Sequence, residues 1–248
     1  MNFFSLLFKN MLSFLFSRSS HTLVLGNVKL LVKPRSLDIF VVAETFLDKT
    51  YEPIFPIGRK VNTIVDLGAH IGDSSIWLAN RFQPRKLLAV EMDTDTFNIL
   101  KKNISLNNLD KEIIPLNKAV YSKDSSEVSY RKSSALSIAN FLSERFGNKK
   151  VKTISLGRII NLLKGSTIDY LKIDIEGSEK FLFTKENKIL FKDKVRFITV
   201  ECHSVIGMNA VLVEDYLHNL GFEVSYKKIT FLNPHNKLIH AYNRAFPI

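Results

Sequence analysis

Hydrophobic and polar positions alternate along most of the chain in blocks that predict strands and helices in turn. The apolar runs at 62–68, 86–92 and 112–120 are separated by two amphipathic segments at 73–82 and 95–107. This order is the βαβαβ pattern of a parallel sheet with helices on both faces. Further strands are predicted at 168–175, 195–203, 222–228 and 238–245, and further helices after Gly177 and at 209–221. The pattern predicts an α/β fold with an open, mostly parallel sheet of seven strands.

Residues 1–57 are predicted to form an extension ahead of the main domain, which spans residues 58–248. Residues 1–16 hold five Phe and four Leu, and as a helix they would present one polar stripe beside a broad apolar face. The segment is too short to cross a bilayer, which takes about 20 apolar residues. It also lacks the small-residue cleavage site of a secretory signal. Such a helix lies on a membrane interface, on a partner or on the domain's own core, and the pattern does not choose among them.

Smaller elements are expected between this helix and the main domain. A Gly-Asn pair divides the β-rich run at 21–32, which is the signal for a two-residue hairpin. Ser36 can cap a helix that ends near Asp48, and two prolines mark 51–60 as a linker. Within the main domain, the less regular stretch at 121–150 is predicted to hold a short strand and a helix.

Composition and charge narrow the classes of protein. With 46% hydrophobic and 24% charged residues among 248, the chain is typical of a soluble globular protein. The net charge of +11 comes from scattered basic residues without a nucleic-acid-binding motif, so a solvated basic surface is favoured over nucleic-acid binding. Cys202 is the single cysteine, which excludes an intramolecular disulfide. We expect a cytoplasmic protein, with peripheral membrane contact through residues 1–16 as the open alternative.

A glycine loop follows the first strand of the main domain. Asp66 ends the strand, Gly68 and Gly72 follow, and Asp73 opens the next helix. The spacing is G-x-x-x-G, with His70 in place of the middle glycine of the dinucleotide fingerprint G-x-G-x-x-G. The two carboxylates suit a pyrophosphate poorly, whereas Asp66 could hold a ligand ammonium directly or through water. A ligand with an adenosine, an amine and no phosphate fits this loop, and that description is S-adenosylmethionine.

A second signal lies at the end of the next strand. Glu91 follows Asp66 by 25 positions, close to the offset at which an acid accepts hydrogen bonds from ribose hydroxyls. As alternatives, Glu91 caps a helix, His70 is a loop filler or backbone cap, and Trp77 is a core residue. The candidate cofactor-binding residues are Asp66, Gly68, His70, Gly72, Asp73, Ser74, Glu91, Met92 and Asn117.

The runs "IVDLGAHIGDSS", "AVEMDTDTFNILKKNISLNNL", "DYLKIDIEGSE" and "ITVECH" resemble the FkbM family of S-adenosylmethionine-dependent methyltransferases. The resemblance covers about Tyr51 to His203, with a looser similarity to the C-terminus. It implies the Rossmann-like class I methyltransferase fold and O-methylation of a hydroxyl on a sugar, glycan or polyketide-like small molecule. Gly157 stands where the family usually has Asp. If that Asp caps a helix, its loss costs about 1 kcal/mol, and if it touches substrate, specificity changes.

Candidate catalytic residues come from the ends of the fourth and fifth strands. Methyl transfer to an alcohol needs in-line alignment of the reacting atoms, and a base or a metal ion to help remove the hydroxyl proton. We interpret His203 as the base, Glu201 as the residue that orients it, and Asp174 as part of the methyl-transfer pocket. The candidate catalytic residues are Lys172, Asp174, Glu176, Glu201 and His203.

Each of these residues also has a plainer interpretation. Lys172 forms a structural ion pair with Asp174 or Glu201, Glu176 and Glu179 favour the start of the next helix, and His203 is a satisfied loop histidine. A metal site is not favoured, because H-x-x-x-H and a cysteine cluster are missing from the sequence. Two other functions stay open as alternatives: a nicotinamide-dependent oxidoreductase, and a non-catalytic membrane-associated or scaffolding protein.

Overall fold

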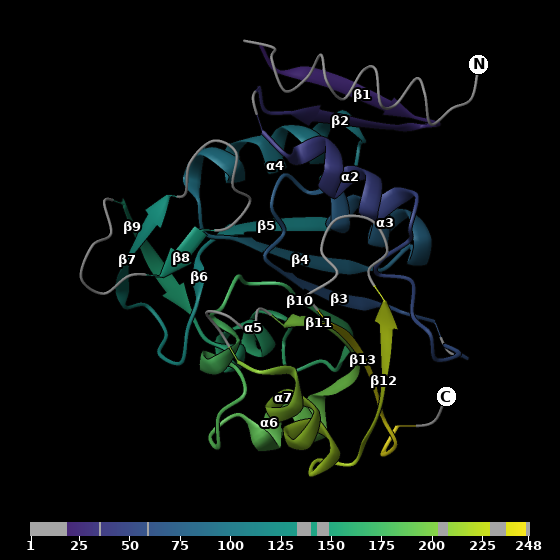
Figure 1. Cartoon of the computed structure of the whole chain (residues 1–248), viewed down its shortest axis with the longest axis vertical. Helices are drawn as coiled ribbons and strands as arrows, with labels where there is room; N and C mark the ends of the chain where they lie inside the picture. The colour runs from purple at the N-terminus through teal and green to yellow at the C-terminus, as the bar shows by residue number, and fades with distance from the viewer. Residues whose placement is uncertain are drawn as a thin grey trace.

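A seven-stranded sheet runs through the centre of the molecule (Figure 1). The computed structural model describes residues 19–34, 36–58, 60–132, 140–142, 149–202, 208–228 and 237–246. The strand order is β12-β13-β11-β10-β3-β4-β5, and β13 runs antiparallel to its two neighbours while the other pairs are parallel. The strands are β3 (Thr63–Leu67), β4 (Lys86–Glu91), β5 (Ile113–Asn117), β10 (Ile168–Ile173), β11 (Val195–Cys202), β12 (Phe222–Lys228) and β13 (Lys237–Asn243). The predicted seven-stranded, mostly parallel sheet is confirmed.

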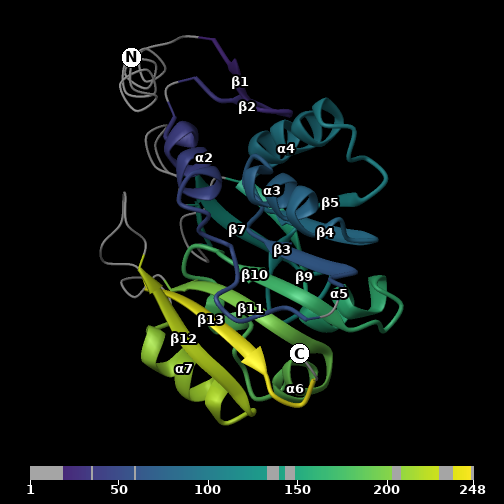
Figure 2. The same ribbon diagram turned by 90° about the vertical axis from the view of Figure 1, so that its right-hand side faces the viewer.

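Helices cover both faces of this sheet, as Figures 1 and 2 show from two directions. One face carries α2 (Asp38–Phe46), α3 (Asp73–Phe82) and α4 (Thr94–Leu106), and the other carries α5 (Leu156–Leu162), α6 (Lys188–Lys194) and α7 (Ala210–His218). The helices α3, α4 and α7 lie where the amphipathic segments predicted them. The layered α/β architecture expected from the alternating pattern is therefore confirmed.

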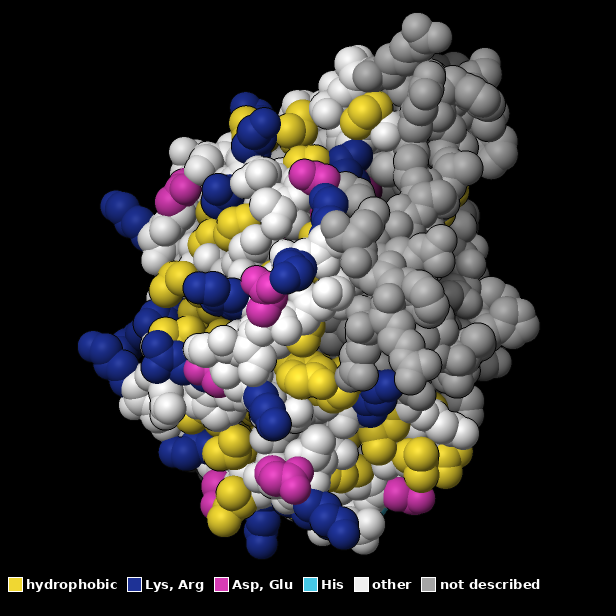
Figure 3. Space-filling view, turned by 90° about the vertical axis from the view of Figure 1, so that its left-hand side faces the viewer, with side chains coloured by type: hydrophobic (Ala, Val, Ile, Leu, Met, Phe, Trp, Pro, Cys, Tyr) yellow, Lys and Arg dark blue, Asp and Glu magenta, His cyan; other side chains and the backbone are white. Residues whose placement is uncertain are grey.

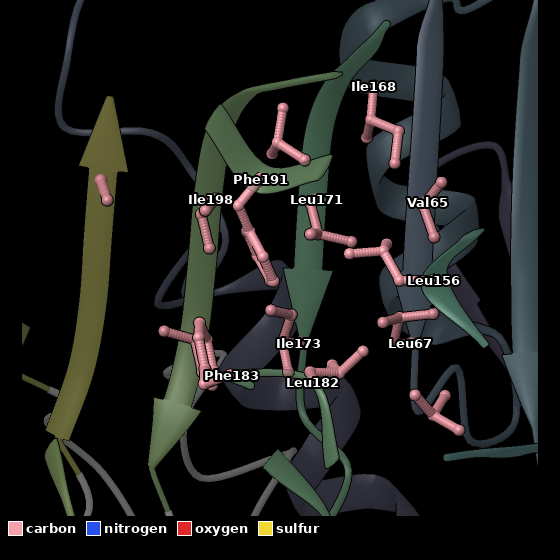
Figure 4. Packing of buried hydrophobic residues seen from close by; sticks show 14 of the residues in the cluster. Val65, Leu67, Leu156, Ile168, Leu171, Ile173, Leu182, Phe183, Phe191 and Ile198 are labelled. Atoms are coloured by element: carbon pink, nitrogen blue, oxygen red, sulfur yellow. The ribbon is translucent and has the colours of Figure 1, made fainter. Parts of the chain in front are cut away.

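Alternate residues of the central strands pack against opposite helix layers. Figure 4 shows strand side chains of the layer that carries α5 and α6, among them Val65, Leu67, Leu171 and Ile173, packed in one cluster with Phe191 of α6. Because successive strand residues point to opposite faces, Asp66 of β3 and Lys172 of β10 point away from this layer, toward the face that carries α2 and α3. That face has its own core, which includes Trp77 as predicted.

The N-terminal extension packs into this second core. Its hairpin consists of β1 (His21–Leu25) and β2 (Val28–Val32), joined by the predicted two-residue turn, in which Gly26 has a φ of 62°. The α2 helix begins two residues after Ser36, whose hydroxyl accepts a hydrogen bond from the N–H of Asp38. It ends at Phe46, two residues before the predicted end. Leu30, Val32, Val42 and Tyr51 belong to one buried cluster with residues of β3, α3 and α4.

The less regular middle of the chain forms a second, smaller sheet. It contains β6 (Ala119–Val120), β7 (Glu127–Lys132), β8 (Asn140–Leu142) and β9 (Lys149–Ile154), in the order β6-β9-β7-β8. The single strand predicted at 112–120 is divided into β5 and β6. The predicted helix at 121–150 is not found among the described residues of that stretch, which form strands and turns.

The described part of one face carries Lys and Arg side chains that are spread among acidic, apolar and other residues (Figure 3). This distribution agrees with the scattered basic residues of the sequence. Within the described residues, none of the helices is long and apolar enough to cross a membrane. Residues 1–16, for which an amphipathic helix is predicted, lie outside the described residues.

Candidate functional site

The loop between β3 and α3 is shaped by two glycines at the carboxyl edge of the sheet. The N–H groups of Gly68 and Ala69 both donate to the carbonyl of Val90, at 2.9 Å each. Gly68 has a φ of +82°, and a Cβ there would lie 1.7 Å from the carbonyl oxygen of Asp174. At Gly72, with a φ of +92°, a Cβ would lie 2.6 Å from a methyl group of a leucine on α4. Both positions therefore favour glycine by their backbone conformation, and Gly68 requires it for space as well, because its neighbour is backbone.

Asp66 occupies the end of β3 and is completely buried. Its Oδ2 accepts hydrogen bonds from the hydroxyls of Ser74 and Ser75 in the first turn of α3, both at 2.6 Å. Its Oδ1 lies 3.1 Å from Nζ of Lys172 on β10. The carboxylate therefore joins β3, α3 and β10, and a contact of Asp66 with a ligand ammonium stays a prediction.

Lys172 is buried among acidic and aromatic groups. Besides Asp66, its Nζ lies 3.6 Å from Oδ2 of Asp174, donates to the carbonyl of Gly68 at 2.9 Å, and sits 5.0 Å from the ring centre of Tyr51. Burial by itself lowers the pKa of such an ammonium, but the charges of the nearby carboxylates outweigh it and the pKa of Lys172 is raised. Lys172 is thus a charged ion-pair partner, as the plainer interpretation predicted, although Asp66 is a nearer partner than Asp174.

Asp174 follows β10 directly and keeps a partly exposed carboxylate, with 21% of its side chain accessible. The hydroxyl of Tyr51 donates to its Oδ2 at 3.3 Å. Tyr51 is itself held in place, because Tyr170 donates a hydrogen bond to its carbonyl at 2.7 Å. Asp174 therefore stands at the sheet edge beside the glycine loop, with one oxygen fixed by Tyr51 and Lys172.

Glu91 ends β4 on the other side of the glycine loop. Its Oε2 accepts from the backbone N–H of His70 at 3.0 Å, and its Oε1 accepts from the N–H of Asp93 at 2.7 Å. Burial raises the pKa of Glu91, and the hydrogen bond from the N–H of Asp93 and the charge of Lys33 offset this only in part. The predicted ribose-binding acid therefore also fixes the loop that is predicted to bind the same ligand.

Two further predicted residues lie beside Glu91 in the fold: Asn117 at the end of β5, and Met92 directly after β4. Asn117 donates hydrogen bonds from its amide to the carbonyls of Glu91 and Met92, at 2.9 and 3.0 Å. Met92 packs against the buried cluster that contains Tyr130 and Val151. The structure thus brings the predicted residues of the first three strands of the main domain to one edge, and a cofactor contact by each of them stays a prediction.

His70 and Asp73 lie at the centre of a polar junction between the loop and the extension. His70 has a φ of 48°, and its Nε2 is 3.2 Å from Nζ of Lys33 and 3.5 Å from Oδ1 of Asp38. The hydroxyl of Thr45 donates to Oδ2 of Asp73 at 2.7 Å. Burial acts to raise the pKa of Asp73, but His70, Thr45 and the charge of Lys172 outweigh it, so this pKa is lowered. Asp73 is a carboxylate at neutral pH.

An acidic surface lies next to Asp174. Glu44 on α2 is half-buried, and its pKa rises to about 7 because of burial and the negative charges of Glu201, Asp174, Asp48 and Asp73. Glu201 lies near the end of β11, and His203 falls outside the described residues. In the part of the chain that the structure describes, no group of three or more His, Cys, Asp or Glu side chains could hold a metal ion. Carboxylates of this kind can accept hydrogen bonds and protons from hydroxyl groups.

The segment after Asp174 differs from its prediction. Glu176 and Gly177 both have positive φ, at 52° and 90°, and form a tight turn. The helix predicted after Gly177 is reduced to a 3-10 turn, η1 (Glu179–Phe181), and α6 begins only at Lys188. Buried Glu179 accepts a hydrogen bond from the N–H of Gly177 at 3.2 Å, so it closes this turn rather than starting a long helix.

Gly157 lies in the first turn of α5. The N-cap is Ser155, whose hydroxyl accepts from the N–H of Arg158 at 3.2 Å. The helix is therefore capped without the acid that the family usually has at position 157. A Cβ at Gly157 would meet Leu190 at an ordinary 3.8 Å.

The extension supplies several site side chains that the sequence patterns did not single out. They are single polar or aromatic residues without a motif spacing: Lys33, Asp38, Glu44, Thr45 and Tyr51. Only Tyr51 lay within the stretch that resembled the family. The others could be identified only once the hairpin and α2 were placed against the glycine loop.

Comparisons with known proteins agree with this arrangement. The family model described as the methyltransferase FkbM domain matches residues 66–224. The methyltransferase sdnD of Sordaria araneosa is 22% identical over 222 residues, which cover 75% of this chain and 82% of the relative. The crystal structure of an FkbM methyltransferase from Methylobacillus flagellatus KT has a TM-score of 0.54 and 15% identity. That similarity covers 82% of this chain and 53% of the other, so the chain spans about half of that protein, and it shows a shared fold.

Proposed function

The chain belongs to the FkbM methyltransferase family, and on that premise we propose that it transfers a methyl group from S-adenosylmethionine to a hydroxyl of a sugar, glycan or polyketide-like small molecule. The nicotinamide-dependent oxidoreductase is set aside by the family match. The choice of acceptor is based on the acidic surface that Glu44, Asp174 and Glu201 form beside the glycine loop.

The residues at the carboxyl edge of the sheet fit an S-adenosylmethionine molecule. Two glycines let the loop backbone turn tightly and pack closely against Asp174 and α4, which holds it at this edge of the sheet. The buried Nδ1 of His70 and Oδ1 of Asp73 have no hydrogen-bond partner within the described residues, and such atoms are costly unless a ligand or water pairs with them. When bound, the cofactor would supply the sulfonium methyl group.

The acceptor is proposed to be neutral because the surface next to Asp174 is negative. Burial, followed by the charges of nearby carboxylates, raises the pKa of Glu44 to about 7. These carboxylates would repel a phosphorylated or otherwise anionic substrate. They can instead accept hydrogen bonds from sugar-like hydroxyls and hold one of them in line with the methyl group. Lys172 does not reverse this, because its single positive charge is matched by the nearer Asp66, which leaves the charge of Asp174 in place.

Removal of the hydroxyl proton is assigned to the same surface. Glu44 has a pKa near neutrality, which is where a general base works best. The earlier assignment, in which His203 is the base and Glu201 orients it, stays a second proposal. The two proposals predict different variants. If Glu44 is the base, its loss should abolish the fall in rate at low pH, and if His203 is the base, the loss of His203 should do so.

Incubation with methyl-labelled S-adenosylmethionine tests the acceptor class. Neutral polysaccharide and polyol fractions, phosphorylated sugars and nucleic acid are offered separately, and the methylated product is located by mass spectrometry. We expect label in the neutral hydroxyl fraction, and loss of most of it in Asp174→Asn. Glu223→Gln serves as control, because Glu223 is exposed at the opposite end of the sheet. Label confined to the phosphorylated or nucleic-acid fractions would refute the neutral acceptor.

Membrane contact through residues 1–16 and a cytoplasmic location stay predictions. Pelleting with anionic phospholipid vesicles, with and without these residues, separates a membrane-binding segment from one that packs on a partner or on the domain. We expect binding to depend on residues 1–16 if the membrane proposal holds. Equal pelleting of the two proteins would end it.

A further inference from the structure

The strand β2 is attached to α4 by side-chain amides. Asn103 accepts from the N–H of Leu31 at 2.6 Å and donates to its carbonyl at 3.0 Å. Asn107, one turn further along at the end of α4, accepts from the N–H of Lys29 at 2.9 Å and donates to its carbonyl at 2.7 Å. Residues two apart on a strand share an edge, and residues four apart on a helix share a face. The two asparagines thus replace a neighbouring strand and fix the position of the hairpin along α4.

The same attachment reaches the glycine loop. The amide of Asn103 also donates to the carbonyl of Ile71 at 2.8 Å, and Asn103 is fully buried. One side chain therefore holds both β2 of the extension and the loop between Gly68 and Asp73. The extension is outside the matched family domain, which begins at residue 66.

Lys33 follows β2 and is directed at the loop. Its Nζ lies 3.2 Å from Nε2 of His70, 3.2 Å from Oγ1 of Thr96 and 3.4 Å from Oδ1 of Asp38. Its backbone N–H also donates to Oδ2 of Asp38 at 2.7 Å. Asp38 is buried, with 2% of its side chain exposed, and these contacts give its carboxyl group the hydrogen-bond and ion-pair partners that water would otherwise provide.

His70 receives this contact in a backbone conformation that few residues adopt. A non-glycine residue in the left-handed region is unfavourable unless contacts around it hold it there. Because the lysine ammonium can only donate, Nε2 accepts and the ring proton is assigned to Nδ1. That nitrogen faces Oδ1 of Asp73 at 3.8 Å, beyond hydrogen-bond distance. The backbone N–H of His70 donates to Glu91, so the ring, the loop and the predicted ribose-binding acid are connected.

We propose that Lys33 and Asp38 are positioning residues that hold the His70 ring, and with it the loop from Gly68 to Asp73, in the conformation that binds the cofactor. The extension is then part of the cofactor site rather than an appendage to it. This inference rests on the proposed function and deepens it, because it assigns cofactor affinity to residues outside the matched domain.

Titration calorimetry and steady-state kinetics with S-adenosylmethionine test the role of Lys33. Lys33→Met should raise Kd and KM for S-adenosylmethionine about tenfold, the order expected from loss of one charged hydrogen bond, and leave kcat at saturation within about twofold. Lys29→Met is the matched control, since Lys29 is an exposed lysine of β2 and its hydrogen bonds to Asn107 are made by its backbone. Lys33→Arg keeps the charge and should restore part of the affinity. An unchanged Kd in Lys33→Met would overturn the inference.

A double-mutant cycle separates positioning from general stability. His70→Asn removes the ring while keeping a residue that tolerates positive φ. In that background, Lys33→Met should cause no further loss of affinity. If the two losses simply add, Lys33 acts independently of His70 and the positioning role is refuted. Failure of the unmodified protein to bind S-adenosylmethionine would instead refute the proposed function, so the two failures are distinguishable.

Discussion

Lys172 and Asp66 are paired across the β10–β3 ladder, with Nζ 3.1 Å from Oδ1 and both side chains buried. A lysine in the middle of a buried parallel strand would be unfavourable on its own. Here it neutralises Asp66, contacts Asp174 and donates to Gly68, so one ammonium links two strands to the start of the glycine loop. The charged pattern of the strand is therefore a structural support for the candidate site.

Loss of this ammonium should destabilise the whole domain. Lys172→Met leaves Asp66 buried without its counter-charge, so we expect the free energy of unfolding to fall by about 3–5 kcal/mol. Urea denaturation followed by circular dichroism measures it. Lys172→Met with Asp66→Asn should recover much of the loss, and Arg81→Gln, which breaks an exposed ion pair with Glu52, should cost about 1 kcal/mol or less. A loss in Lys172→Met no larger than in Arg81→Gln would show that the pair is unimportant for stability.

Gly68 should tolerate no side chain. Gly68→Ala places a Cβ 1.7 Å from the carbonyl of Asp174, so the loop must move and binding of S-adenosylmethionine should be lost. Gly165→Ala is the control, because Gly165 has a similar φ of +73° and nothing within 4 Å of the added atom. It should cost only the backbone penalty of about 1–2 kcal/mol. Calorimetric titration and thermal unfolding of both variants check this, and equal behaviour of the two would contradict the close approach at Gly68.

The elevated pKa of Glu44 should be visible in the pH dependence of stability. The folded protein retains a proton up to about pH 7 that the unfolded chain loses near pH 4.5. Stability from this group is therefore present below about pH 4.5 and lost as the pH rises to about 7. Glu44→Gln removes this effect. As the pH rises through this window, the free energy of unfolding of the variant should therefore gain about 1–2 kcal/mol relative to that of the unmodified protein, once solvent screening is allowed for. A difference that does not change with pH would refute the shifted pKa.

Gly157→Asp should stabilise the protein. Position 157 is in the first turn of a capped helix, with room for a Cβ. Replacing glycine and adding a negative charge near the helix N-terminus should together contribute about 0.5–1 kcal/mol. Gly157→Ala separates the backbone effect from the charge effect, and thermal unfolding at low and high salt measures both. A change in KM for the acceptor, with no gain in stability, would show instead that this position touches substrate.

The sequence periodicity predicted the central sheet and its large helices because these depend on local patterns. The α3 helix begins and ends where the run from Asp73 to Phe82 predicted. The helix predicted directly after Gly177 is not formed. Glu176 and Gly177 adopt positive φ in a turn, and a regular helix begins only at Lys188.

Within the site, the glycine loop and Glu91 could be found from spacing, because each follows a strand directly. The contacts of Lys33, Asp38 and Glu44 could not be found in this way. They depend on where the extension packs, and that placement is fixed by the hydrogen bonds of Asn103 and Asn107, between residues more than 70 positions apart in the chain.

Calorimetric titration with S-adenosylmethionine tests the cofactor site most directly. We expect saturable binding with a Kd below about 1 mM, within the usual range for enzyme ligands. Glu91→Gln should weaken it about tenfold, since one oxygen that accepts a backbone N–H is replaced by a donor, while Glu223→Gln should bind normally. A folded protein that shows no binding at millimolar S-adenosylmethionine would contradict the assignment of this edge of the sheet as a methyltransferase site.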